Sequence, residues 1–84
     1  MAKYNKLAVR ILAGASDKNI AFDDLRGLLL RLGFAERTRG SHHIYRKAGI
    51  EEKVVLQREG SNAKPYQVRQ VRVIILKYHL AGED

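Results

Sequence analysis

The chain has 84 residues, a formal net charge of +7 and no cysteine. This length suits one domain with a single small core, because short chains bury a smaller fraction of their surface, and we expect no second domain. Without cysteine, the fold holds no disulfide and no thiolate metal site. No apolar run approaches the length of a membrane span or a signal-peptide core, so we expect a cytoplasmic protein without a membrane partner.

The positive charge is concentrated between Arg37 and Lys77. This region holds ten Lys or Arg residues against three acids, so it accounts for the whole net charge of +7. Clustered cations favour an anionic partner such as a nucleic acid, an anionic membrane surface or an acidic protein.

Apolar residues recur at helical spacing in three segments of the chain. The first runs from residue 3 to 13 and ends at Gly14, and the third begins at Pro65, which suits the first turn of a helix. Asp23 and Asp24 favour the start of the second helix through its dipole. We predict that this helix is the main core helix, because it carries five large apolar residues on one stripe: Phe22, Leu25, Leu28, Leu29 and Leu32.

Between the second and third predicted helices, the spacing changes to short extended runs separated by turn-forming residues. Three strands in a meander are predicted at 34–39, 42–47 and 53–57. Gly40 and Ser41 form the turn of the first hairpin, and residues 59–62 end the third strand. The predicted fold is α+β in the order ααβββα, with a three-stranded antiparallel sheet that the last helix covers.

The tract Gly-Ser-His-His-Ile-Tyr at 40–45 places two of the three histidines in the basic region. A histidine titrates near neutral pH and can therefore take or give a proton in the cell. In a strand, alternation sends His42 and His43 to opposite faces, so only one of them can serve a given site. The pattern does not say which, because Ile44 and Tyr45 are both apolar enough to face the core. In the alternative interpretation, both histidines are ordinary strand residues, one packed and one solvated.

Cleavage of RNA without a metal needs a base near the 2′-OH, an acid for the departing 5′-oxygen and cations for the negative charge of the phosphorane. One histidine with neighbouring Arg and Lys supplies a minimal version of this set. The acids of the basic region have no metal-binding spacing, and the chain has no glycine-rich phosphate loop. We therefore expect neither a metal nor another cofactor.

The start of the last predicted helix is a second candidate for anion binding. Its free N–H groups and positive dipole end can hold a phosphate beside Lys64, although ordinary helix capping is an equal alternative. Arg69 and Arg72, one turn apart, would extend the same cationic face. Tyr45 and Tyr66 can stack on bases, but tyrosines at such positions are more often core or rim residues. We expect His79 to be structural.

Three stretches of the chain resemble the HicA-type toxins of bacterial toxin–antitoxin systems, also called YcfA-like. The first is Leu32-Gly33-Phe34, the second runs from Arg39 to Tyr45, and the third from Ala63 to Val71. The resemblance covers roughly residues 20–80. The Gly-Ser-His-x-x-aromatic core at 40–45 is specific in this context, because it follows a leucine-rich helix that ends in Gly-Phe.

The resemblance implies a toxin that cleaves mRNA and whose fold is similar to the double-stranded-RNA-binding domain, with helices on one face of a three-stranded sheet. Its partner would be a HicB-type antitoxin that covers the active site. The catalytic histidine of the family directly follows Gly-Ser, which corresponds to His42, so His43 would be a neighbour. The helix at 3–13 extends beyond the minimal family domain, and we divide the single domain 1–84 into an extension, 1–19, and a core, 20–80.

We therefore predict a metal-independent endoribonuclease in which His42 is the general base. The residues expected to contact RNA are Gly40, Ser41, Arg37, Arg39, Arg46, Lys64 and Arg69. A non-catalytic RNA-binding module with the same cations is the first alternative. The second is a protein-interaction domain whose basic face meets an acidic partner.

Overall fold

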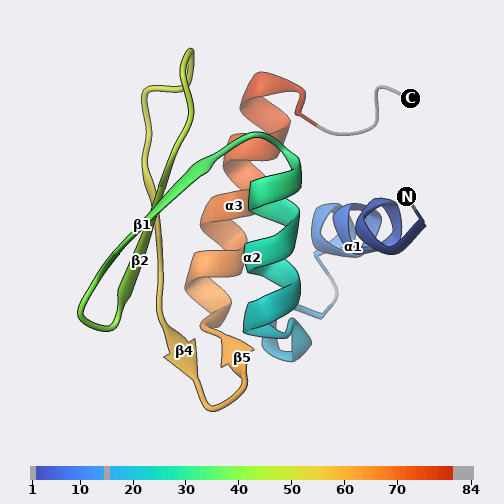
Figure 1. The fold of residues 1–84 in the computed structure, drawn as a ribbon. Coiled ribbons are helices and arrows are strands. Elements are labelled where there is room, and N and C mark those ends of the chain that lie inside the picture. The colour runs from blue at the N-terminus through green and yellow to red at the C-terminus, as the bar shows by residue number, and fades with distance from the viewer. Residues whose placement is uncertain (1, 15, 81–84) are drawn as a thin grey trace.

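The computed structural model describes residues 2–14 and 16–80, and it has an α+β fold (Figure 1). In chain order the elements are α1 (Ala2–Ala13), the 3-10 helix η1 (Asp17–Asn19), α2 (Phe22–Arg31), β1 (Ala35–Arg39), β2 (His42–Arg46), β3 (Val54–Leu56), β4 (Arg58–Glu59), β5 (Asn62–Ala63) and α3 (Pro65–Tyr78). The predicted order of helices and strands is confirmed. In these described ranges, no helix has the length and apolar character needed to cross a membrane.

Strands β1, β2 and β3 form an antiparallel sheet in that order. Within the first hairpin, Arg39 pairs with His42 and Arg37 with Ile44, and on the other side of β2 Ile44 pairs with Val55. Gly40 in the turn has a φ of 59°, a left-handed conformation that glycine adopts without steric cost. This tight turn sets the register of the hairpin and thereby decides which side chains share a face.

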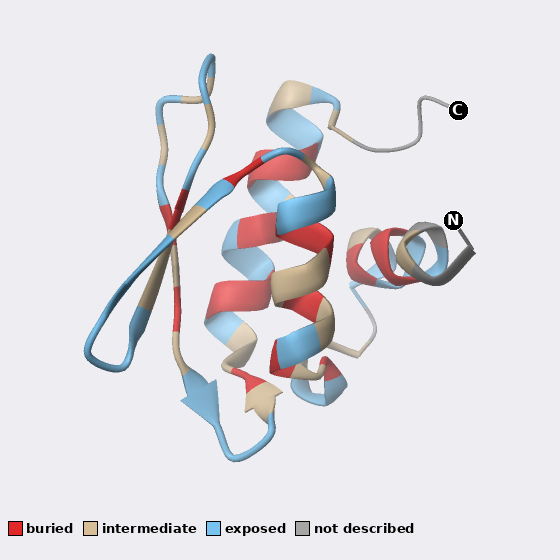
Figure 2. Ribbon diagram, viewed as in Figure 1, coloured by how far each residue is buried: buried red, intermediate tan, exposed pale blue. Residues whose placement is uncertain are grey.

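Helices α2 and α3 lie against one face of the sheet, and α1 packs on the far side of these two helices (Figure 1). Figure 2 shows buried residues on all three helices and in the middle of the strands, where the layers meet. Tyr45, Val54 and Leu56 supply the buried side chains of the sheet. The arrangement is compatible with the fold of a double-stranded-RNA-binding domain, as the family resemblance implies.

The contact between α1 and α2 depends on a glycine. A β-carbon built at Gly27 would meet the hydroxyl and ring of Tyr4, so the absence of a side chain at Gly27 lets the two helices approach. Leu7, Ala8 and Ile11 are buried along the same helix. The N-terminal helix is therefore an integral part of the packing.

Arg72 links α3 to the N-terminal segment. Its guanidinium donates hydrogen bonds to the Ile11 carbonyl at 3.1 Å and to the Asp17 carboxylate at 3.0 and 3.3 Å. The prediction that Arg72 extends a cationic face with Arg69 is therefore wrong, because its charge is matched by Asp17 inside the helical layers. Asp17 is remote in sequence, and nothing local to α3 indicates the pairing.

A second short hairpin replaces the simple strand end predicted at residues 59–62. Strand β4 pairs with β5, and Ala21 forms a bridge with Asn62. The backbone N–H of Ala63 donates to the Ile20 carbonyl. Two-residue strands are too short to show alternation, and their bridging partner comes from the connector before α2, so the sequence pattern did not reveal them.

Candidate functional site

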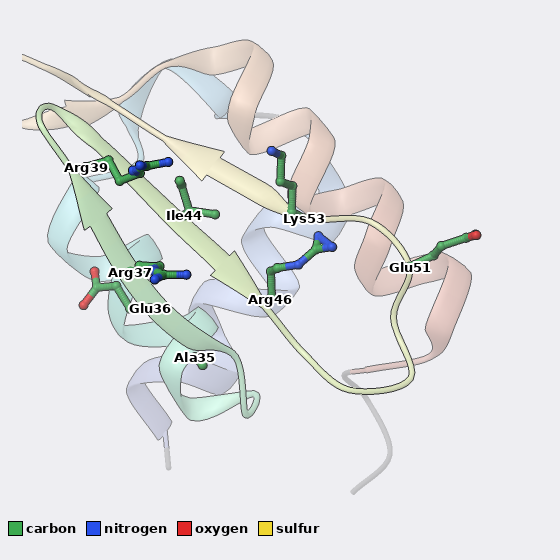
Figure 3. A pocket seen from close by; sticks show the side chains of 8 residues that line it. All are labelled: Ala35, Glu36, Arg37, Arg39, Ile44, Arg46, Glu51 and Lys53. Atoms are coloured by element: carbon green, nitrogen blue, oxygen red, sulfur yellow. The ribbon is translucent and has the colours of Figure 1, made fainter.

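The sheet face turned away from α2 and α3, here called the outer face, carries the basic residues of the first hairpin. Arg37 and Arg39 project from β1, and Arg46 projects from β2, on the same side as Ile44 (Figure 3). Alternation accounts for this set, because the intervening Tyr45 is buried toward the helices. The structure thus brings together three of the cations predicted to bind RNA.

An open cavity of about 770 Å³ lies on the outer face. Its lining comes from the first hairpin, β3 and the loop before β3 (Figure 3): Ala35, Glu36, Arg37, Arg39, Ile44, Arg46, Glu51 and Lys53. Four of these eight residues are cationic. The lining of this cavity therefore carries more positive than negative side chains.

The four cavity cations have no charged partner in the described part of the chain. None of the side chains of Arg37, Arg39, Arg46 and Lys53 makes a hydrogen bond or an ion pair with another described residue. Four other cations are paired with acids: Arg26 binds Glu36, Arg58 binds Asp23, Arg72 binds Asp17 and Lys77 binds Glu52. The charge of the four cavity cations is therefore available to an external anion.

His42 is the first residue of β2 and lies directly opposite Arg39, next to the exposed turn formed by Gly40 and Ser41. Its side chain is exposed and has no hydrogen-bond or ion-pair partner among the described residues. His42 is not part of the cavity lining, but its cross-strand partner Arg39 is. An imidazole in this position is accessible to a bound molecule.

His43 points to the opposite side of the sheet. Its ring meets the ring of Phe22 edge-on, with centroids 4.9 Å apart, and its Nδ1 lies 3.5 Å from Glu36 Oε2. The Nδ1 atom is buried and makes no hydrogen bond. Of the two histidines, His42 therefore faces solvent and His43 is packed.

Glu36 anchors the first hairpin to the helices. Arg26 of α2 donates hydrogen bonds to its two carboxylate oxygens at 2.7 and 2.9 Å, and the Tyr45 hydroxyl donates another at 2.6 Å. The Arg26 and Tyr45 hydrogen bonds lower the pKa of Glu36 to about 2, so it is ionised at neutral pH. Burial, together with this carboxylate, raises the pKa of Tyr45. Tyr45 is therefore a core residue that holds the hairpin, and it is not exposed for base stacking.

Four residues predicted to contact RNA lie outside the cavity lining, namely Gly40 and Ser41 in the turn, Lys64 and Arg69. Lys64 precedes α3, where its Nζ lies 3.4 Å from Gln57 Oε1, and its carbonyl accepts the N–H groups of Gln67 and Val68 at the start of the helix. Arg69 is exposed on α3. Contact of these four residues with RNA stays a prediction.

The chain was compared with known proteins. A family model described as the HicA toxin of bacterial toxin-antitoxin matches residues 22–78, which is more than half of the chain. The chain belongs to the HicA toxin family. No curated protein and no solved structure shows a significant match to it.

Membership of the HicA family makes the protein a toxin of a bacterial toxin–antitoxin system and implies an antitoxin as its partner. The matched residues include the whole outer face and both helices that support it, whereas α1 lies outside the match. Among the described residues, no group of three or more His, Asp or Glu side chains is placed to hold a metal ion.

Sequence reasoning missed Lys53 as a member of the site. Its place follows from the register between β2 and β3, which pairs Ile44 with Val55 and, continued by two residues, sets Lys53 across from Arg46. The loop between these strands has no short turn motif that fixes this register in advance. Given the register, alternation alone would have put Lys53 on the outer face.

Proposed function

We propose that this HicA-family protein is an endoribonuclease that cleaves mRNA without a metal and uses His42 as the general base. The observation that carries the proposal is the position of an exposed histidine directly opposite Arg39, which lines a cavity together with three other cations. RNA supplies the phosphates that such a surface attracts. The family assignment supports the same reading, because it makes the chain a toxin.

In the proposed reaction, the imidazole of His42 takes the proton of the ribose 2′-OH. The 2′-oxygen then forms a bond to the neighbouring phosphorus while the bond from phosphorus to the 5′-oxygen breaks. The products are a 2′,3′-cyclic phosphate and a 5′-hydroxyl, whose proton comes from solvent on this open face. Arg39, across from His42, stabilises the negative charge that develops on the phosphorane oxygens.

The further roles follow from the same arrangement. Gly40 and Ser41 shape the turn that brings His42 to the end of its strand, and Arg37 and Arg46 hold a phosphate beside Ile44. The antitoxin would be of the HicB type and would cover the outer face with acidic groups, in the cytoplasm where mRNA is found. Its removal would expose His42 to RNA.

The test is cleavage of a single-stranded RNA by the purified chain in the presence of EDTA. We expect wild type to cleave and His42→Ala to lose about 10²–10⁴-fold in rate, the usual contribution of a general base, with an unchanged circular dichroism spectrum. His43→Ala is the matched control: it removes the packed neighbour, so it lowers thermal stability but retains cleavage. Undiminished cleavage by folded His42→Ala contradicts the assignment of the base.

A non-catalytic RNA-binding module is the second candidate. It is favoured by the absence, in the described residues, of a side chain hydrogen-bonded to His42 that would orient its imidazole as a base. This candidate predicts salt-dependent RNA binding that is the same for wild type and His42→Ala, and no cleavage by either.

A further inference from the structure

The strand register arranges the side chains of the outer face in rows across the sheet. Arg37 of β1 lies opposite Ile44 of β2, which in turn lies opposite Val55 of β3. Along β2, His42 lies two residues before Ile44 and Arg46 lies two residues after it. Because a strand rises about 3.3 Å per residue, each lies roughly 7 Å from Ile44 along the strand. Ile44 is therefore at the centre of the face, between the histidine and a cation.

Ile44 and Val55 form an apolar patch in surroundings that are otherwise cationic. Both residues are half-buried, although no helix covers the outer face. Ile44 lies on the floor of the cavity, and its side chain points into the hollow between Arg39 and Arg46 (Figure 3). A pair of β-branched residues stabilises any sheet, but here Ile44 also lines a cavity with four cations that have no charged partner among the described residues.

One cavity cation lies beside this patch, and two lie at the cavity end away from the turn. Lys53 and Arg46 stand close to each other there, and Arg37 is the cross-strand neighbour of Ile44 (Figure 3). Of the two carboxylates in the lining, Glu36 is occupied by Arg26 and Tyr45, and Glu51 is exposed at the edge. A phosphate would therefore find three positive side chains here.

We infer that the centre of the outer face is a subsite for one nucleotide of single-stranded RNA. Its base contacts Ile44 and Val55, and the phosphate that follows binds Arg37, Arg46 and Lys53. The inference rests on the proposed function for one point only, the position of the scissile phosphate between His42 and Arg39. The RNA then runs along β2 from the turn toward Arg46.

The chemistry of the patch selects a single strand. In a duplex the faces of the bases are stacked on one another, and proteins recognise it through its shape, phosphates and 2′-hydroxyls. An apolar patch would contribute nothing to such contacts. A single strand exposes both an apolar base face and a phosphate on each nucleotide, and sheets of other RNA-binding domains receive bases on their open face. This combination matches the apolar centre and the cationic end of the outer face.

The experiment measures binding of the full chain to a single-stranded RNA hexamer with a 2′-O-methyl group on every ribose, which blocks cleavage. Fluorescence anisotropy at several NaCl concentrations gives the affinity and its salt dependence. Each phosphate contact to a single strand contributes about −0.7 to the slope of log K against log salt. Lys53→Gln should therefore make this negative slope less steep by about 0.7. Lys18→Gln, an exposed lysine in η1, is the charge-matched control and should change neither quantity.

Ile44→Thr tests the base contact separately. It retains a β-branched side chain and removes apolar surface, so affinity should fall roughly fourfold, the equivalent of one buried methylene group, with the slope unchanged. In wild type, the methyl NMR signals of Ile44 and Val55 should shift when the hexamer is added. This second readout needs no variant and so does not depend on whether Ile44→Thr folds.

The outcomes separate this subsite from the proposed function. If wild type cleaves unmodified RNA but Lys53→Gln and Ile44→Thr bind the hexamer as Lys18→Gln does, the subsite is wrong and the nuclease assignment stands. If the predicted effects occur but unmodified RNA stays intact, the subsite stands and the nuclease assignment is wrong. Equal competition by an RNA duplex, or methyl shifts caused only by the antitoxin, would also overturn the subsite.

Discussion

At the scale of single residues, two adjacent histidines have different surroundings because a strand alternates its side chains. His42 meets solvent and Arg39, whereas His43 meets Phe22 and the carboxylate of Glu36. Glu36 also binds the side chains of Arg26 and Tyr45. This carboxylate therefore holds the inner face of the hairpin against α2, and it thereby fixes the position of the outer face.

The low pKa of Glu36 predicts a pH-dependent contribution to stability. The pKa falls from a usual 4.5 to about 2 on folding, so the stabilisation is complete above pH 4.5 and is lost as the pH falls from 4.5 toward 2. Glu36→Gln should lower the free energy of unfolding by about 1–3 kcal/mol at pH 7, and the deficit should shrink below pH 4.5. Urea denaturation of wild type and Glu36→Gln at pH 7, 5 and 3.5 measures this difference in the free energy of unfolding. Glu51→Gln, at an exposed position, is the control, and a pH-independent deficit for Glu36→Gln would rule out this account.

At the scale of elements, the N-terminal helix is tied to the core helices at two points. Gly27 gives space to Tyr4, and Arg72 holds the end of α1 together with Asp17. Glycine in the middle of a helix ordinarily costs about 1 kcal/mol relative to alanine. Its presence in α2 is explained by the contact with α1.

The effect of Gly27→Ala on stability should therefore change sign with the residue at position 4. In wild type, the new methyl group meets the Tyr4 side chain, so we expect a lower melting temperature despite the better helix propensity. In a Tyr4→Ala background, the same change should stabilise by about 1 kcal/mol. Thermal unfolding of the four proteins in this double-mutant cycle measures the coupling. Stabilisation in both backgrounds would show that α1 does not constrain Gly27.

At the scale of the whole molecule, one sheet serves the core and the candidate site at once. Its inner face contributes to a single cluster of buried residues that includes side chains from all three α-helices. Its outer face carries the cations of the cavity, which have no charged partner among the described residues. Because the same strands carry both faces, loss of the core should also abolish the site.

Leu29→Asp should unfold the whole domain. Leu29 is 1% exposed, and a domain of this length has about 4–12 kcal/mol of stability, which the loss of an apolar contact and the burial of a carboxylate would largely remove. Leu30→Asp is the matched control, because Leu30 is the next residue of α2 and is 40% exposed. Circular dichroism and one-dimensional NMR distinguish the two proteins. A folded Leu29→Asp variant would contradict the assignment of α2 as the main core helix.

The sequence by itself determined the elements and much of the site. Periods of 3.6 and 2 residues and the turn at Gly40 depend on neighbours along the chain, so they predicted the helices and the meander and sent His42 and His43 to opposite faces. The resemblance to the HicA family selected His42 over its neighbour.

Only the tertiary structure decided which face of the hairpin is open, since Ile44 and Tyr45 are both apolar and either can face a core. It also paired Arg72 with Asp17, built the hairpin of β4 and β5, and placed Lys53 beside Arg46. Each of these depends on contacts between segments that are distant in sequence. Local propensity carries no information about such partners, because they are selected when the layers pack and the buried surface and charges are matched across them.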